Sequence, residues 1–317
     1  MNFLNLLRKA VKYPANKANE MVKRTNWYQN VIPDLDNFPT NDWYRKHLER
    51  NFEIAIVGSS SGVFGFDLSV APGLKAFNWC LQPMAMEYAH RVLQNFFSIL
   101  KKDGIVAIVF SPFSGLQALG KQGKTTDDRF YHLLDGTLIE NFEEVARRRR
   151  YPYFYNPKQA IKHMLKDEPP KPKKATLRQL STSEEYERDA DNWIRMWMRE
   201  FTISDLDAPL TEQNKEGSEA RAAVIQQMVD FCLERDLHPI FVTPPCHPAL
   251  ARKFTPEFRK NYIKDFLEPF IQQGIPFYDY LEHPDFTDDP LFANAYFLSP
   301  TGAQAFTRHF LKALSLL

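Results

Sequence analysis

The sequence has few cysteines, few glycines and almost no net charge, and it lacks any long hydrophobic run. Its three cysteines are too few and too scattered for a disulfide framework, which is typical of a reducing compartment. No run of about 18 apolar residues occurs, so we predict no transmembrane helix. The balance of 40 Lys and Arg against 39 Asp and Glu argues against a nucleic-acid-binding protein. With 22 prolines and only 12 glycines, large proline-rich loops are expected rather than many tight turns.

The N-terminus also lacks a signal peptide of the usual kind, because Arg8, Lys9 and Lys12 interrupt its short apolar patch. We therefore predict a cytoplasmic protein. Residues 1–25 are expected to form an amphipathic helix with a basic polar face. This helix either lies on an anionic membrane, as a peripheral membrane contact, or packs on the domain with its basic face in solvent. Pro14 favours the second interpretation, because it breaks the helical pattern early.

The 317 residues are enough for one large domain, or for one domain with a sizeable insertion. The composition, 44% hydrophobic and 25% charged, is that of a globular protein and excludes a mostly disordered or fibrous chain. We divide the chain into an N-terminal helical extension (1–50) and an α/β domain (51–317). The α/β domain carries a mainly helical insertion at about 113–215.

Outside the insertion, short apolar segments alternate with amphipathic helical segments. The clearest strand, 105–110 (IVAIVF), is apolar throughout, as in a parallel sheet that is buried on both faces. The alternation predicts an α/β fold, a flavodoxin-like three-layer sandwich with about five parallel strands. We expect strands at 53–57, 75–81, 105–110, 239–243 and 276–280, and helices at 84–100, 218–235, 256–273 and 302–316.

The insertion shows no strand pattern. Its basic run, Arg147–Arg150, is either an anion-binding site or the charged last turn of a helix at 138–150. Residues 169–174 (PPKPKK) have the composition of a solvated loop or linker. Trp193 and Trp197 mark a helix that we expect to pack back on the α/β body.

Three segments follow strands of the expected sheet, namely 58–62, 111–115 and 243–248. Ligands of doubly wound folds bind at the carboxyl ends of the strands, so these segments are the candidate site. In the Gly58-Ser59-Ser60 turn, a serine hydroxyl would enter the site beside a backbone N–H that can bind an oxyanion. The same turn is compatible with a phosphate-binding loop or with an ordinary strand-to-helix junction.

Segment 54–68 (IAIVGSSSGVFGFDL) resembles the nucleophile block of the SGNH/GDSL hydrolases. Segment 291–306 (LFANAYFLSPTGAQAF) resembles their C-terminal Asp-x-x-His block, as found in relatives from exopolysaccharide and cell-wall gene clusters such as the D-alanyl transfer proteins. The resemblance implies that Ser60 occupies the nucleophile position and that Ser59 replaces the usual Asp. It also implies that Asn294 and Phe297 occupy the Asp and His positions, so the catalytic dyad is degenerate.

The other family blocks are altered as well. Asn78-Trp79-Cys80 stands where relatives often show Asn-x-Gly, which implies an oxyanion or substrate role for Asn78 and for the Cys80 N–H, beside Gly58 and Ser59. Segment 111–114 (SPFS) has no Gly-x-Asn-Asp, so a third oxyanion donor is missing. The resemblance covers residues 50–112 and 215–317 and does not extend into the insertion.

Because Phe297 cannot accept a proton, a base would have to come from elsewhere. His247 follows the strand at 239–243 and should reach the same edge as Ser60, so it is the candidate replacement. Cys246 beside it is a candidate nucleophile if His247 lowers its pKa. Alternatively, Pro-Pro-Cys-His-Pro is a rigid loop whose His bonds to the backbone or helps to bind a polar ligand. His283 is a further candidate base, and no His/Cys/Asp spacing indicates a metal site or a cofactor.

Two functions remain open. The first is a serine esterase or O-acyltransferase that acts on a carbohydrate or a cell-surface polysaccharide precursor, with Ser60 as nucleophile and His247 as base. The second is a catalytically inactive relative that binds a carbohydrate, another small molecule or a partner protein in a crevice of Ser, Asn and His groups. The missing dyad favours the second function, whereas the retained serine turn indicates that the site is used.

Overall fold

The computed structural model describes residues 14–26, 28, 49–82, 84–116, 130, 133–167, 177 and 179–317. The chain divides into two compact units. Unit 1 consists of Met1–His47 with Gln122–Lys174, and unit 2 consists of Leu48–Lys121 with Ala175–Leu317. Residues 175–215, which the sequence suggested to be part of the insertion, thus belong to the unit that contains the sheet.

Unit 2 is built on a five-stranded sheet in which every neighbouring pair is parallel. The strand order is β2-β1-β3-β4-β5, the flavodoxin-like order, and it confirms the predicted fold class. The chain moves outward in opposite directions from β1 and β3, which makes the gap between their carboxyl ends the topological switch point. The strands are β1 (Phe52–Val57), β2 (Ala76–Asn78), β3 (Leu100–Val109), β4 (His238–Thr243) and β5 (Phe277–Asp279).

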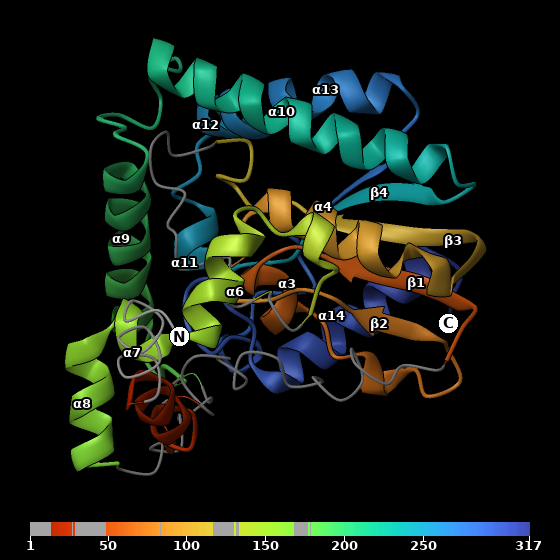
Figure 1. Ribbon diagram of the computed structural model, residues 1–317. Helices are drawn as coiled ribbons and strands as arrows, with labels where there is room; N and C mark the ends of the chain where they lie inside the picture. The colour runs from red at the N-terminus through yellow and green to blue at the C-terminus, as the bar shows by residue number, and fades with distance from the viewer. Residues whose placement is uncertain are drawn as a thin grey trace, which may run out of the picture. The chain divides into compact units, whose positions relative to one another are not determined.

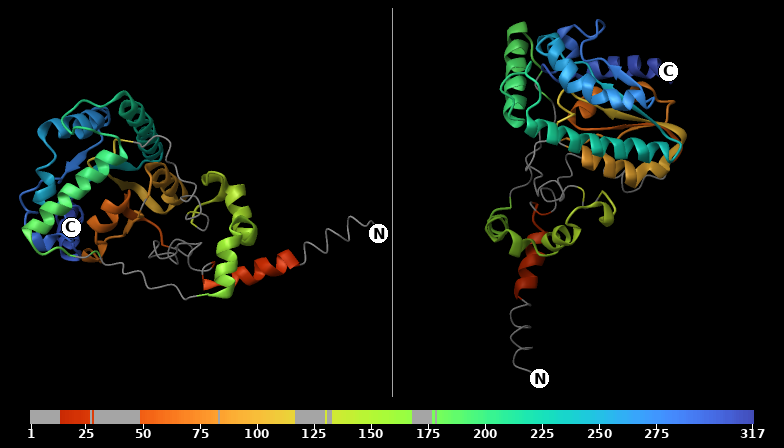
Figure 2. Two further views of the ribbon diagram at one scale, coloured as in Figure 1. Left: turned by 90° about the vertical axis from the view of Figure 1, so that its left-hand side faces the viewer. Right: turned by 90° about the horizontal axis from the view of Figure 1, so that it is seen from above.

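Helices cover both faces of this sheet (Figures 1 and 2). On one face, α10 packs against α4 and α13, and on the other face α14 packs against α3. Three layers of this kind bury the central strands on both sides, which explains why β1 after Glu53 and β3 from Ile105 onward are apolar. The helices of unit 2 are α3 (Ser60–Gly65), η3 (Leu68–Val70), α4 (Met86–Phe96), η4 (Phe97–Ile99), α9 (Ser183–Glu200), α10 (Glu212–Leu233), α11 (Pro248–Ala251), α12 (Pro256–Arg259), η6 (Lys260–Lys264), α13 (Asp265–Gln272), η7 (Asp289–Leu291) and α14 (Pro300–Ala313).

Several predicted boundaries are wrong. The helix expected at 218–235 begins at Glu212, and of the strand expected at 75–81 only Ala76–Asn78 forms β2. The helix expected at 84–100 ends at Phe96, and β3 already begins at Leu100. Lys101 and Lys102 therefore belong to a strand, and the Asp103-Gly104 pair that suggested a helix end is an irregularity in β3, where Asp103 has a φ of 61°. The helix expected at 256–273 is interrupted by the π-helical turn η6, which separates α12 from α13.

The insertion helix α9 packs back on the α/β body as expected, through aromatic contacts. The ring of Trp197 lies 4.9 Å from that of Phe113, in the loop that follows β3. It also lies 4.9 Å from the ring of Tyr296, in the loop that precedes α14. This helix therefore braces two of the loops at the carboxyl edge of the sheet.

Unit 1 is helical where it is described: residues 14–23 form a helix, and η5 (Gly136–Leu138), α6 (Phe142–Arg150), α7 (Pro152–Tyr155) and α8 (Pro157–Leu165) follow. The N–H of Tyr153 donates to Asn19 at 3.1 Å, and that of Asn26 donates to Asp167 at 2.9 Å, which joins its two chain segments. The basic run at 147–150 forms the last turn of α6, which agrees with its interpretation as the charged end of a helix. Residues 1–13 and the linker at 169–174 lie outside the described residues.

A search of the described helices finds none with both the length and the apolar character that crossing a membrane would require.

His90 provides a pH-dependent contribution to the stability of unit 2. It lies on α4, is 9% exposed, and packs edge-on against Phe231 of α10 at 5.9 Å. Burial lowers its pKa from the ordinary 6.5 to about 4, and the charge of Arg91 acts in the same direction. Between these two pH values, His90 is protonated in the unfolded chain but neutral in the folded protein. The contribution of neutral His90 to stability is therefore fully present above pH 6.5 and is lost as the pH falls towards 4.

We predict that the free energy of unfolding falls by about 2 kcal/mol between pH 7 and pH 5 because of this residue. Urea titrations at both pH values should show that His90→Leu removes this part of the pH dependence. His238→Leu is the control, because the His238 side chain is 62% exposed. An unchanged slope in His90→Leu would contradict the assignment.

Candidate functional site

The candidate site begins where β1 and β3 end side by side. Gly58 follows β1 directly and has a φ of 152°, and a Cβ at this position would lie 2.8 Å from Val109 Cβ. Only glycine permits this backbone to approach β3 so closely. The chain then turns at Ser59 into α3, so that the first turn of this helix lies at the switch point of the sheet.

A cavity of about 140 Å³ opens at this point. Its volume is close to that of cavities that hold a six-membered ring. Serine hydroxyls from the two strand exits line it together with apolar side chains and one arginine, from α10. The lining residues are Gly58, Ser59, Ser61, Met84, Ala85, Met86, Ala89, Val109, Ser111, Ser114, Leu116 and Arg221.

Arg221 brings a buried charge to the cavity wall. It is 8% exposed, and its Nη1 donates to Glu87 Oε2 on α4 at 3.1 Å. Among the described residues, Arg221 Nε and Glu87 Oε1 have no hydrogen-bond partner although both atoms are buried. Because a guanidinium has five N–H donors, this pair has hydrogen-bonding capacity left over.

Hydroxyl groups of Ser61, Ser111 and Tyr296 meet beside the cavity. Ser61 Oγ lies 2.8 Å from Ser111 Oγ, which joins the exits of β1 and β3. Burial raises the pKa of Tyr296 to about 12, although hydrogen bonds with Ser111 and Ser61 act in the opposite direction. The three residues also line a space of about 10 Å³, enough for about one water molecule, in front of Pro244.

Ser60 is the first residue of α3 and is half-buried. It is not among the residues that line either cavity. Within the described part of the chain, its hydroxyl has no hydrogen-bond partner, whereas Ser59 Oγ accepts from the N–H of Met84 at 3.2 Å. The serine that meets other side chains at the switch point is thus Ser61, one residue after the predicted nucleophile.

The groups predicted to bind an oxyanion are engaged in local structure. Asn78 Nδ2 donates to the carbonyl of Gly62 at 2.8 Å, and its Oδ1 accepts from the N–H of Cys80 at 3.0 Å. The Cys80 N–H therefore already has an acceptor. Burial raises the pKa of the Cys80 thiol well above its ordinary value, so the thiol stays neutral against Gly62.

His247 caps α11 and has partners at both ring nitrogens. Its Nδ1 accepts from the N–H of Ala249 at 3.1 Å, so the proton of the neutral ring is on Nε2, which lies 3.0 Å from Asp289 Oδ1. The ring stacks on Tyr186 with 3.9 Å between ring centroids and an interplanar angle of 3°. Burial lowers the pKa of His247, and the hydrogen bond with Asp289 acts in the opposite direction. The bond to the Ala249 N–H agrees with the alternative interpretation, in which this histidine bonds to the backbone, and the role of His247 as a base stays a prediction.

Cys246 is also buried, and burial raises the pKa of its thiol. Its Sγ lies 3.6 Å from the carbonyl of Leu281, on the loop after β5. A neutral, buried thiol is a poor nucleophile, so the geometry does not favour the predicted activation of Cys246 by His247.

Asn294 and Phe297 shape the loop before α14. Asn294 Oδ1 accepts from the N–H groups of Tyr296 and Phe297 at 2.9 and 2.7 Å. The ring of Phe297 is 5% exposed and lies 4.7 Å from the ring of Phe64, one helical turn after Ser60. An apolar ring therefore fills the place beside α3 where the family resemblance puts the histidine.

Two of the strand exits named from the sequence, 58–62 and 111–115, line the cavity, but other residues of the candidate site were not predicted. Tyr296 and Arg221 were not predicted, because no local motif connects them with the serine turn. Ser61 lay inside the predicted turn, and the helical rotation of about 100° per residue decides which of two adjacent serines meets Ser111. Counting residues from the end of β1 into the first turn of α3 could have indicated that Ser61, and not Ser60, faces Ser111.

In comparisons with known proteins, no family model matches the chain and no curated protein matches it. The resemblance to the SGNH/GDSL hydrolases therefore stays a prediction.

We predict that Asn294→Ala lowers the free energy of unfolding by about 1–2 kcal/mol, because two backbone N–H groups lose their acceptor. Asn294→Asp keeps an oxygen at the same place and should change stability by less than about 0.5 kcal/mol. Urea unfolding of both variants measures the difference. Equal losses in both variants would show that the amide group itself, and not the acceptor oxygen, is required.

Proposed function

We propose that unit 2 is an SGNH-like α/β domain that binds a small polar ligand at the switch point of its sheet and does not hydrolyse esters. The observation that carries this proposal is the 140 Å³ cavity, whose wall combines serine hydroxyls with the buried, incompletely partnered Arg221. Polar groups that converge in a small cavity at this edge are typical of ligand sites in doubly wound folds.

Among the described residues, the candidate bases are engaged elsewhere, which argues against hydrolysis. A serine hydroxyl needs a base within hydrogen-bond reach, and the lone pair of neutral His247 is directed at the Ala249 N–H. Phe297, at the position where the resemblance expects the histidine, has an apolar ring that packs against Phe64. Asn294 Oδ1 accepts hydrogen bonds from backbone N–H groups of its own loop. The oxyanion donor that the resemblance offers, the Cys80 N–H, is committed to Asn78.

The chemistry of the wall indicates the class of ligand. Ser59, Ser61, Ser111 and Ser114 offer hydroxyls that can both donate and accept hydrogen bonds, which suits a molecule rich in hydroxyl groups. Arg221 adds a cationic donor, which suits a carboxylate or a phosphate. The ligand that fits both features is a sugar-sized molecule with an acidic group, as in sugar acids and sugar phosphates.

The first test addresses catalysis. We predict that a fluorophosphonate probe does not label Ser60 in the folded protein, because its hydroxyl has no hydrogen-bond partner that could act as a base among the described residues. Intact-mass measurement of the wild type beside Ser60→Ala and Ser61→Ala gives the answer. Labelling of the wild type that disappears in Ser60→Ala alone would overturn the proposal and return the protein to the serine esterases or acyltransferases.

The second test addresses binding. We predict that the protein binds D-glucuronate or D-glucose 6-phosphate, as measured by isothermal titration calorimetry. It should bind D-glucose at least about tenfold more weakly, because a hydrogen bond to a charged group contributes about 1.5–3 kcal/mol. Arg221→Met should weaken acidic-sugar binding by a similar factor.

Arg221→Met leaves Glu87 as an unpaired, partly buried charge, so the double variant Glu87→Gln with Arg221→Met tests the same contact in a protein that should fold. Arg188→Met is the matched control, since Arg188 also pairs with a glutamate, Glu184 at 2.9 Å, but its side chain is 67% exposed. If neither acidic sugar binds, or if all variants bind equally, the cavity does not have the proposed role.

A further inference from the structure

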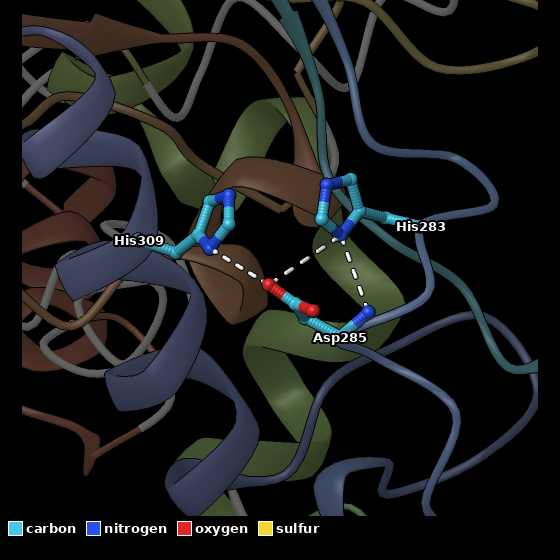
Figure 3. A group of neighbouring side chains, drawn as sticks. All are labelled: His283, Asp285 and His309. Atoms are coloured by element: carbon cyan, nitrogen blue, oxygen red, sulfur yellow. Dashed lines mark hydrogen bonds and ion pairs between the residues drawn. The ribbon is translucent and has the colours of Figure 1, made fainter.

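Three potential metal ligands from different parts of the sequence meet near the C-terminus. His283 and Asp285 lie in the loop that follows β5, and His309 lies on α14 (Figure 3). Figure 3 shows the carboxylate of Asp285 between the two imidazole rings, each of which turns a nitrogen towards it. This cluster is independent of the cavity and of the function proposed for it.

The donor atoms have nearly the spacing of a coordination shell. Asp285 Oδ2 lies 3.4 Å from His309 Nδ1 and 4.0 Å from His283 Nδ1. One atom from each residue can be chosen so that all lie within 4.8 Å of one another. Bond lengths of about 2.0–2.2 Å in a tetrahedral site place neighbouring ligand atoms about 3.3–3.6 Å apart. Small side-chain rotations are therefore enough to bring the three donors around one cation.

The imidazole of His283 is already oriented for this role. Its Nδ1 accepts from the backbone N–H of Asp285 at 3.3 Å, so in the neutral ring the lone pair is on Nδ1 and the proton is on Nε2. The lone pair therefore faces the backbone N–H of Asp285, while the carboxylate Oδ2 of the same residue lies 4.0 Å from Nδ1. A cation with stronger attraction for that lone pair would replace this long hydrogen bond without a change of tautomer.

Aromatic packing holds both rings in place. His309 meets Tyr280 and Phe286 at ring-centroid distances of 5.3 and 5.6 Å, and His283 meets the same two rings at 5.4 and 5.7 Å. The two imidazoles lie 4.9 Å apart. Side chains that are fixed by packing lose little entropy on binding a ligand, so the arrangement is preorganised.

Charge also favours a cation at this place. Within the described part of the chain, the ion-pair partners of the Asp285 carboxylate are these two imidazoles, and no Lys or Arg pairs with it. The Asp285 side chain is 61% exposed, and those of His283 and His309 are 27% and 33% exposed, so a cation can reach all three from solvent.

We propose that His283, Asp285 and His309 form a binding site for a divalent transition-metal ion of the zinc class. Two imidazoles and one carboxylate suit Zn²⁺, Co²⁺ or Ni²⁺, whereas Mg²⁺ and Ca²⁺ prefer oxygen ligands alone. Three protein ligands leave at least one coordination position for water or for an exogenous anion. The bound ion would join the loop after β5 to α14 and so stabilise the folded state over the unfolded one.

The test is calorimetric titration of the full chain, free of any affinity tag, with ZnCl₂. We expect saturable binding of one ion, no comparable binding of MgCl₂, and a rise of the melting temperature in Zn²⁺. His309→Ala and Asp285→Asn should each weaken Zn²⁺ binding by at least about 100-fold, since even residues that only orient a ligand change affinity by about 10–100-fold. Asp285→Asn is nearly isosteric and keeps the assay valid if His309→Ala disturbs packing.

His238→Ala is the matched control. His238 forms a comparable pair with one carboxylate, Asp103 at 3.7 Å, but this pair lacks a second imidazole, and the variant should bind Zn²⁺ as the wild type does. Substitution with Co²⁺ gives an independent readout, because imidazole coordination changes its visible spectrum. The proposal is overturned if the wild type binds no Zn²⁺, or if Zn²⁺ binding survives unchanged in both His309→Ala and Asp285→Asn.

Discussion

The close approach of the β1 exit to β3 is the constraint on which the site depends. Gly58 lets the backbone pass against Val109, and Gly62 then lets the first turn of α3 pass against Cys80. A side chain at either position would push α3 away from the sheet. With both glycines in place, Ser61 comes within hydrogen-bonding distance of Ser111 on the neighbouring strand exit. The cavity lies between these two strand exits and the start of α4, with Met84, Ala85 and Met86 in its wall.

Polar residues that look catalytic in the sequence are used here to fix loops. Asn294 supplies acceptors to its own turn, Asn78 bridges β2 to α3, and His247 caps α11 while it joins Asp289. Each of these groups satisfies backbone N–H or C=O groups that loops at a sheet edge cannot pair among themselves. With both ring nitrogens hydrogen-bonded and its face against Tyr186, the imidazole of His247 is held in one orientation.

The sequence was sufficient for the sheet because strand signals are local. The apolar run at 105–110 and the β-branched run at 53–57 predict buried parallel strands wherever the rest of the chain lies. The start of β3 could not be predicted in this way, because Leu100 pairs with Phe52 across an irregular register that local periodicity does not reveal. The site was predicted only at the level of strand exits. Tyr296 and Arg221 reach it through tertiary packing, and His309 meets Asp285 through the docking of α14, so no spacing rule connects them.

The Arg221–Glu87 pair is difficult to explain by stability alone. Buried ion pairs contribute little net free energy compared with apolar residues of similar volume, and α4 and α10 could pack as well through such residues. This pair also leaves Nε and Oε1 without partners in the described structure, and a buried polar atom without a partner costs about 1–3 kcal/mol. If this position served only to pack α4 against α10, replacement of the Arg221–Glu87 pair by apolar residues would increase the stability of the fold. The cost is offset if the charged groups serve a molecule that enters beside them, and Arg221 lies in the wall of the cavity at the one edge of the sheet where such molecules bind in this fold class.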